Sequence, residues 1–250
     1  MKSKTTGLLL LILVAIAIAM PGLSQKMPSV AKEKIYKQRV LPIVDFLERQ
    51  ANDAKVFSKQ KEKASRYDRQ SSQPIQEAYM VSGRVWSTAW SKDLTALPFN
   101  KSDVVLIGGV MGSRAHLSND KTGIYSEFEV QVEEILKDNV KESVHPGTSI
   151  YLERFGGAVR FSSGVIQRYE TTGQGMPTVG QRYLFFLKRI NGRDFEIVTG
   201  YQFDGELVAP LDGSIVEEGK GRYPFDVYQG SDVSTFLRTV RTLANQQPSS

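Results

Sequence analysis

Cysteine is absent from all 250 residues of the chain. Disulfide bonds and cysteine ligands for zinc or iron–sulfur clusters are therefore impossible. Small exported domains often use disulfides to compensate for a small hydrophobic core. If this chain is exported, its core must be large enough to hold the fold by itself. Acylation of a cysteine, which would anchor a lipoprotein, is excluded as well.

Histidine is nearly as scarce, with only His116 and His145. Neither has a second histidine two to four residues away, so the sequence predicts no histidine-based metal site, and we interpret both as solvated loop imidazoles. A Gly-x-Ser-x-Gly nucleophile elbow is also missing. We therefore assign no catalytic residue, no metal ligand and no cofactor. A non-enzymatic protein is the favoured interpretation, and the question stays open.

Long apolar runs are limited to one, Gly7 to Met20, which two lysines precede. These 14 residues fall short of the roughly 20 that span a bilayer, and the layout is typical of an export signal. We predict cleavage between Ser24 and Gln25, with an earlier cut after Ala19 as a second option. The expected location is periplasmic or secreted. The alternative is an uncleaved N-terminal helix that anchors the protein in the membrane.

Positive charge is concentrated near the N-terminus. The formal net charge is +5. Lys2 and Lys4 contribute +2, and residues 25–74 hold 12 Lys and Arg against 6 Asp and Glu, a net of +6, so residues 75–250 carry −3. Apolar spacing predicts a short amphipathic helix over roughly Ala31 to Asn52. Residues Lys55 to Gln73 have too few apolar side chains to pack, so we expect a solvated linker there. The alternative is an arm that touches an anionic polymer or lipid.

From Ser102 onward, short runs rich in β-branched and aromatic residues alternate with Gly, Pro, Asn and Asp. The clearest strand is Tyr125 to Leu136, where apolar and acidic residues alternate with period two. The alternation slips by one residue at Glu133 to Leu136, which indicates a β-bulge. Asn191-Gly192 is the strongest hairpin turn. Many short strands with frequent turns predict a closed barrel or a sandwich.

The chain ends with a helical pattern. Apolar residues recur at helical spacing after Ser231-Asp232, a natural N-cap pair. They are Val233, Phe236, Leu237, Val240 and Leu243. We expect this helix to pack its apolar stripe on the β-sheet.

Six short motifs resemble known proteins: Ser102–Gly108, Tyr125–Phe128, Val132–Lys137, Gly156-Gly157, Gly175–Tyr183 and Phe186–Lys188. Over about residues 102–212 the chain resembles an uncharacterised family of exported bacterial β-rich proteins, which has no assigned activity. More distantly, these strands are similar to OB-like barrels of the netrin type, without the cysteines of those modules. The resemblance implies an OB-like barrel and transfers no catalytic residue, because fold alone does not set function.

The predicted fold is mainly β: a small closed or partly open antiparallel OB-like barrel with a C-terminal packing helix and a helical or disordered basic N-terminal extension. The predicted division is a signal peptide at 1–24, a basic helix and linker at 25–74, the barrel domain at 75–230, and a helix with a tail at 231–250.

Four arginine–aromatic pairs in the barrel region form the one candidate ligand site: Arg154-Phe155, Arg160-Phe161, Arg168-Tyr169 and Arg182-Tyr183. On an OB-type face, basic and aromatic groups together bind polyanions or sugar chains. Adjacent strand residues point to opposite faces, so arginines that face water put their aromatic neighbours in the core. The four arginines therefore form either a basic stripe or ordinary solvated side chains beside core aromatics.

Two other patterns bear on possible chemistry. Gly108 to Gly112 superficially resembles a phosphate-binding glycine loop, but a turn rather than a helix follows it, so we expect no nucleotide. Glu127, Glu129 and Glu133 share one strand face at a spacing compatible with a glycosidase pair. A hydrated outer face of a half-buried strand has the same pattern, and we favour that interpretation.

The sequence thus predicts an exported, non-catalytic envelope or periplasmic module that binds an anionic envelope polymer or another protein. Contact with a membrane is expected only if the N-terminal helix stays uncleaved. The alternatives are a hydrolase whose site is assembled only in three dimensions and a membrane-tethered structural protein.

Overall fold

The computed structural model describes residues 41–47, 54–77, 84–86, 94–139, 143–171, 173–192, 194–213 and 224–246, without the side chains of 54–57 and 84–86. The chain divides after Gln38, and every described residue belongs to the second unit, Arg39–Ser250. The expected signal segment and its cleavage site at Ser24 and Gln25 lie outside the described residues. Among the helices that are described, none is long and apolar enough to cross a membrane.

Five strands form a closed barrel: β3 (Val104–Leu117), β4 (Ile124–Asp138), β5 (Ser149–Phe155), β8 (Arg182–Asn191) and β9 (Asp194–Asp204). Around the ring the order is β3, β4, β5, β9, β8 and back to β3. The β5–β9 pair is parallel and the other four pairs are antiparallel. This is the connectivity of an OB-fold barrel, so the predicted OB-like class is confirmed.

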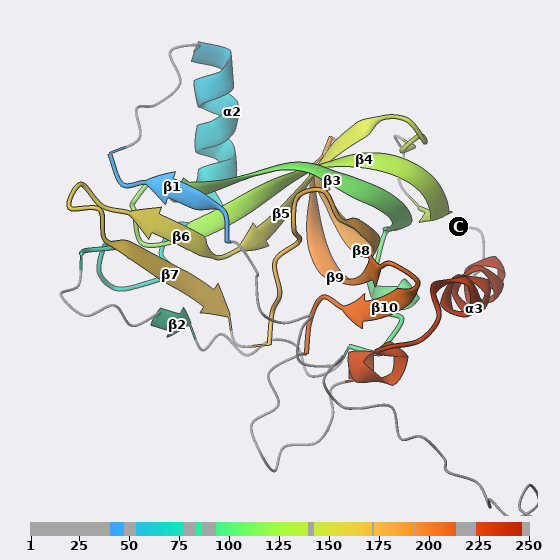
Figure 1. The fold of residues 1–250 in the computed structure, drawn as a ribbon. Helices are drawn as coiled ribbons and strands as arrows, with labels where there is room; N and C mark the ends of the chain where they lie inside the picture. Colours follow the sequence, from blue (N-terminus) through green and yellow to red (C-terminus); the bar gives the residue numbers. More distant parts are fainter. Residues whose placement is uncertain are drawn as a thin grey trace, which may run out of the picture. The chain divides into compact units, whose positions relative to one another are not determined.

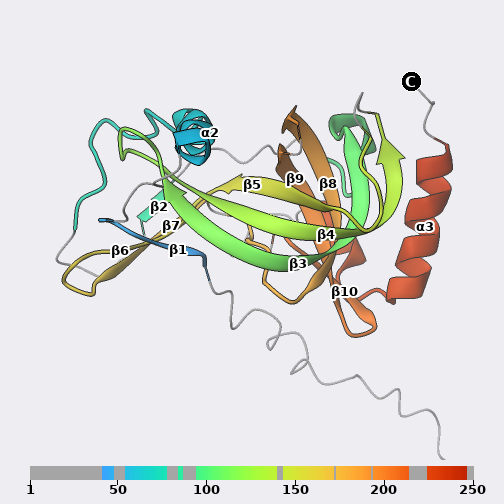
Figure 2. The ribbon, with the colours of Figure 1, turned by 90° about the horizontal axis from the view of Figure 1, so that it is seen from above.

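A second, smaller sheet and several short elements complete the fold. The second sheet has the order β1 (Ile43–Asp45), β6 (Gly157–Arg160), β7 (Ile166–Thr171), β2 (Arg84–Trp86). The remaining elements are β10 (Leu207–Pro210), the α-helices α2 (Ala54–Ser65) and α3 (Val233–Asn245), and the 3-10 helices η1 (Phe99–Lys101) and η2 (Pro224–Tyr228). Figures 1 and 2 show the barrel strands between the second sheet on one side and α3 on the other.

Bulges in the long strand pair bend the sheet into a barrel. The register of β3 against β4 shifts at Leu136 and at Glu133, where the alternation slips in the sequence, so the predicted bulge is confirmed. Gly108 lies within β3, not in a loop before a helix. A Cβ atom on Gly108 would lie 2.6 Å from Val130 Cγ1 and 2.7 Å from the Gln131 carbonyl oxygen. Glycine is therefore required there for close strand packing.

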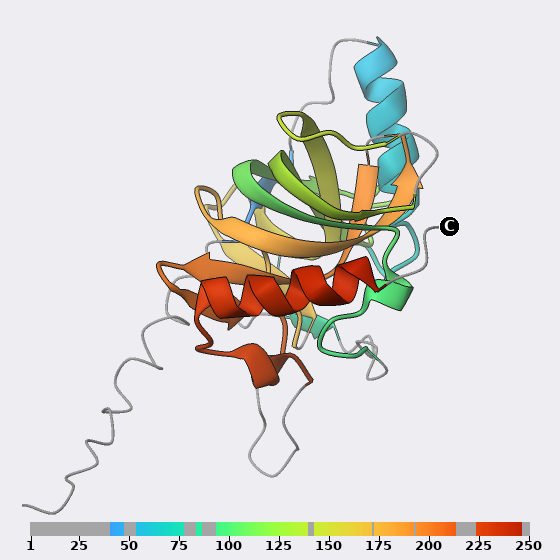
Figure 3. The ribbon, with the colours of Figure 1, turned by 90° about the vertical axis from the view of Figure 1, so that its right-hand side faces the viewer.

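The barrel strands are apolar on both sides over part of their length. The interior is filled by one core cluster: Val104, Leu106, Val110, Phe128, Val130, Val132, Ile150, Leu152, Tyr183, Phe185, Leu187, Phe195 and Ile197. A second cluster lies outside β3, β8 and β9, where Phe236 and Val240 of α3 cover Val105, Ile107 and Phe186. Figure 3 shows α3 lying across these strands.

The predicted start of the C-terminal helix is confirmed as well. The Asp232 side chain accepts a hydrogen bond from the Thr235 backbone N–H at 2.8 Å, as expected of an N-cap residue. The predicted turn at Asn191-Gly192 joins the β8–β9 hairpin, and the β6–β7 hairpin turns at residues 162–164.

Two expectations for the basic N-terminal extension are wrong where it is described. Within the helix expected over 31–52, residues Ile43–Asp45 instead form β1, parallel to β6. The solvated linker expected over 55–73 instead contains α2 and a turn that lie against the barrel, with Lys63 and Ala64 buried. The segment has few apolar side chains, and ion pairs and backbone hydrogen bonds add to the burial of Ala64 and Ile75 and to the stacking of Tyr67 in holding it in place.

Candidate functional site

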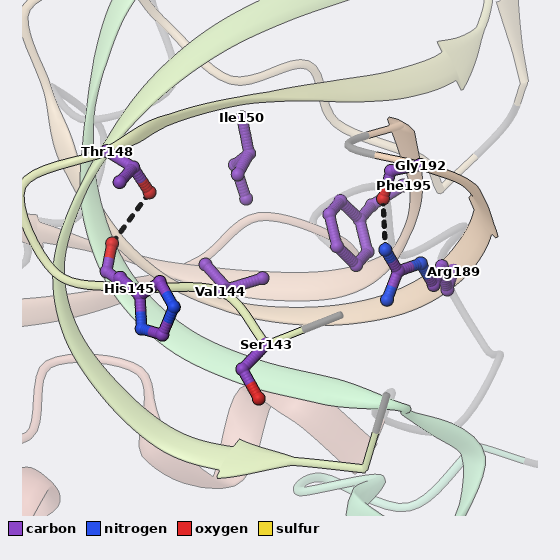
Figure 4. A pocket seen from close by; sticks show the side chains of 8 residues that line it. All are labelled: Ser143, Val144, His145, Thr148, Ile150, Arg189, Gly192 and Phe195. Carbon is purple, nitrogen blue, oxygen red and sulfur yellow. Dashed lines mark hydrogen bonds between the residues drawn. The ribbon is translucent and has the colours of Figure 1, made fainter. Parts of the chain in front are cut away.

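A pocket of about 350 Å³ lies between the β4–β5 connection and the β8–β9 hairpin. Its lining residues are Ser143, Val144, His145, Thr148, Ile150, Arg189, Gly192 and Phe195. Val144, Ile150 and Phe195 belong to the barrel core, and their side chains point toward the centre of the pocket (Figure 4). The pocket is thus a recess over the barrel interior with an apolar floor.

Polar groups surround this floor. Thr148 Oγ1 donates a hydrogen bond to the His145 carbonyl oxygen at 2.7 Å, which tightens the β4–β5 turn. Arg189 donates to the Gly192 carbonyl oxygen and lies 5.7 Å from the centre of the Phe195 ring. His145 is exposed in its loop, as predicted. The pocket therefore combines an apolar floor with hydroxyl groups, an imidazole and a guanidinium group.

The second histidine differs from the prediction. His116 lies in β3, not in a loop, and only 8% of it is exposed. Its ring stacks on Tyr125 at 5.1 Å, and its Nδ1 accepts a hydrogen bond from Gln60 Nε2 of α2 at 3.1 Å. Burial, with the positive charges of Arg114 and Lys63, lowers the pKa of His116 to about 4.

A cluster of charged groups lies where α2 meets the outer face of β4, β5 and β9. Lys63 Nζ is 2.8 Å from Asp194 Oδ1 and 3.6 Å from Glu153 Oε1, and it also binds Glu127 Oε2. The side chains of Glu153 and Asp194 are 0% and 1% exposed, and that of Lys63 is 9% exposed. Burial alone lowers the pKa of Lys63, but hydrogen bonds to Asp194 and Glu127 outweigh it and raise the pKa.

The residues that follow α2 extend this contact. Arg66 Nη2 donates to both carboxylate oxygens of Glu153, at 2.6 and 2.7 Å, and the Tyr67 hydroxyl donates to Glu153 Oε2 at 3.1 Å. The Tyr67 ring stacks on Tyr125 with centroids 4.3 Å apart. Burial, together with the negative charge of Glu153, raises the pKa of Tyr67. Lys63, Arg66 and Tyr67 thus cover the β4–β5 face together.

Backbone hydrogen bonds attach the same segment to the β3–β4 loop. The Arg69 N–H donates to Asp120 Oδ2 at 2.8 Å, and the Ile75 N–H donates to the Lys121 carbonyl oxygen at 2.7 Å. A Cβ atom on Gly123 would lie 2.4 Å from the Tyr67 carbonyl oxygen, so the two chains approach as closely as glycine allows. The segment that follows α2 is therefore packed on the barrel as part of the domain.

Arg154 of the predicted basic stripe is buried, with 2% of the residue exposed. Its guanidinium pairs with Asp212, with Nη1–Oδ1 and Nη2–Oδ2 distances of 2.6 and 3.0 Å. Arg154 Nη1 also donates to the Gly175 carbonyl oxygen, while the Gly175 N–H donates to Asp212 Oδ1 at 2.8 Å. Arg154 therefore ties two loops to β5 inside the protein and faces no external ligand.

The other three arginines are exposed but divided between two sheets. Arg160 and Arg168 lie on β6 and β7 of the smaller sheet, and Arg160 Nη1 is 3.5 Å from Asp45 Oδ1. Arg182 lies on β8 and pairs with Glu133, with both Nε and Nη2 donating to the carboxylate. The structure does not bring the four arginines together on one exposed face.

Of the three acids considered for glycoside chemistry, Glu127 binds Lys63 and Glu133 binds Arg182. A different triad, Glu127, Glu153 and Asp194, places carboxylate oxygens within 4.8 Å of one another. That spacing suits a cation, and the cation among these oxygens in the structure is the Lys63 ammonium group.

No pattern in the sequence indicates this cluster directly. Lys63 and Arg66 belong to a charge-rich segment that looks solvated, and their partners on β5 and β9 are distant in the chain. A comparison of the sequence with known protein families and with curated proteins finds no match. Function must therefore be argued from the geometry of the chain itself.

Proposed function

We propose that the chain is an exported, non-catalytic binding module whose ligand occupies the pocket between the β4–β5 connection and the β8–β9 hairpin. One observation carries the choice of site. OB barrels commonly bind their ligands on the face of the second and third strands, which are β4 and β5 here. That face is covered by the chain's own residues Lys63, Arg66 and Tyr67. The pocket is concave, and the same segment does not line it.

The lining predicts the chemistry of the ligand. Small-molecule sites are typically apolar recesses of roughly 300–1,000 Å³ with a few polar groups that fix orientation. Val144, Ile150 and Phe195 provide the apolar surface, and Arg189 provides positive charge at one side. The ligand is therefore a small amphiphile that has an apolar or aromatic body and an acidic group. Of the expected partners, this favours a small anionic molecule or the end of an anionic polymer over a flat protein surface.

The test uses 8-anilinonaphthalene-1-sulfonate as a probe, because it combines an aromatic body with one sulfonate group. Full-length protein is titrated with the probe at neutral pH and fluorescence is recorded. Saturable binding at a single site is expected. Ser143→Trp places a bulky side chain at the exposed edge of the pocket and should weaken binding at least tenfold. Thr239→Trp, at an exposed position of α3, is the matched control and should bind as the wild type does.

Equal binding by the wild type and Ser143→Trp would refute the pocket as the site, as would the lack of saturable binding. Arg189→Met separates the two parts of the proposal. Loss of binding to the sulfonate probe with retained binding of an uncharged anilinonaphthalene supports the acidic group. Equal losses for both probes would reject it.

A further inference from the structure

The cluster under α2 holds a lysine and two carboxylates in a reactive arrangement. Lys63 Nζ is in direct contact with Asp194 Oδ1 at 2.8 Å, and Glu127 contacts the same nitrogen. Lys63 comes from α2 and Asp194 is the first residue of β9, so the contact joins elements that are far apart in the chain. We propose that Lys63 and Asp194 form an intramolecular isopeptide bond, an amide between Nζ and Cγ.

The reaction balances without any outside reagent. The Lys63 ammonium passes one proton to the Glu127 carboxylate, and the neutral amine attacks Cγ of Asp194. The Cγ–O bond to one carboxylate oxygen then breaks. That oxygen leaves as water, after it has taken one proton from Nζ and the other back from Glu127. An amide N–H remains, and Glu127 is a carboxylate again.

Geometry lowers the barrier to the step. Groups held in contact react with effective molarities of about 10⁵–10⁸ M, since the entropy of bringing them together is already lost on folding. The side chains of Asp194 and Lys63 are 1% and 9% exposed, so little water reaches an amide once it has formed. Glu127 is 22% exposed and is the most accessible of the three acids. Its Oε2 contacts Lys63 Nζ directly, so Glu127 is placed to receive the proton that Nζ releases.

Glu153, the third acid of the cluster, has a different role from Asp194 and Glu127. Glu153 accepts two hydrogen bonds from Arg66 and one from the Tyr67 hydroxyl, which occupy its carboxylate oxygens and make it an anchor for this segment and not the electrophile. The raised pKa of Lys63 makes the free amine rare, so the reaction is slow. A bond that forms once in the lifetime of a molecule tolerates a slow step. In a chain without cysteine, it supplies the covalent cross-link that disulfides cannot.

Intact-mass measurement of the denatured full-length protein tests the proposal. The expected mass is lower, by one water molecule, than the mass that the sequence and the observed termini require. Proteolysis followed by tandem mass spectrometry should then show a branched peptide that joins Lys63 to Asp194. Lys63→Ala and Asp194→Ala should both restore the full mass. Lys61, exposed on the same helix as Lys63, and Asp204, exposed at the other end of β9 from Asp194, provide matched controls. Lys61→Ala and Asp204→Ala should keep the lower mass.

Three results would overturn the proposal. One is wild-type protein at full mass without a branched peptide, a result that does not depend on whether any variant folds. Another is a branched peptide that persists in Asp194→Ala. The third is a loss of water that maps to a succinimide at Asp204-Gly205 or Asp212-Gly213, with peptides 63 and 194 unlinked. A Glu127→Gln variant that cross-links at the wild-type rate would refute the proton transfer.

Discussion

His116 should make the stability of the domain depend on pH between neutrality and pH 4. Its pKa is lowered from 6.5 to about 4, because the ring is buried beside Arg114 and Lys63. The unfolded chain therefore binds a proton at a higher pH than the folded chain does. Stability from this residue is complete above pH 6.5 and is lost as the pH falls toward 4. Since one pKa unit corresponds to about 1.4 kcal/mol, the full loss is about 3.5 kcal/mol.

The assay is urea unfolding at pH 7.5 and at pH 5. At pH 5 the protonation of His116 in the unfolded chain should already lower the free energy of unfolding by about 2 kcal/mol. Carboxylates also begin to titrate near pH 5, so the wild type is compared with His116→Gln. Glutamine does not titrate and keeps a polar partner for Gln60. The drop in the free energy of unfolding should be about 2 kcal/mol smaller in His116→Gln than in the wild type. His145→Gln, at the exposed histidine, should behave as the wild type. The same drop in both proteins would refute the burial argument for His116.

Two further changes test other contacts. Gly123→Ala puts a methyl group 2.4 Å from the Tyr67 carbonyl oxygen and should cost about 1–3 kcal/mol in urea unfolding. Gly112→Ala, with open space around it, should change the free energy of unfolding by less than about 0.5 kcal/mol, and equal effects would contradict the close approach. Asp212→Ala leaves the buried Arg154 charge unpaired and should cost about 3–5 kcal/mol in thermal or urea unfolding. A loss below about 1 kcal/mol would show that Arg154 is solvated.

The barrel could be predicted where information is local. Period-two alternation predicts the strands, and the Asn-Gly dipeptide predicts the β8–β9 hairpin. The break in this alternation at Glu133 predicts a bulge. Asp232, as an N-cap residue, predicts the start of α3. The parallel pairing of β5 with β9 has no local signature, since it depends on how distant strands meet when the barrel closes.

The candidate site was less accessible to sequence reasoning. The arginine–aromatic pattern groups Arg154 with three exposed arginines, although Arg154 shares its alternation with Ile150 and Leu152, which face the core. That signal was present in the sequence. Its partner Asp212 was not identifiable, because it comes from a distant loop. Charged residues that pair across a fold look the same in sequence as charged residues in water, so the composition of the α2 segment alone predicts a linker.

Selective lysine modification of the native protein tests most directly whether residues 54–77 lie on the β4–β5 face. The folded chain is treated briefly with an amine-reactive acetylating reagent, and modified sites are mapped by mass spectrometry. Lys61 should react, since it lies exposed on α2. Lys63 should stay unmodified in the native state, and an amide with Asp194 would keep it unmodified after unfolding as well. Equal modification of Lys61 and Lys63 in the native state would show a solvated segment and contradict the account.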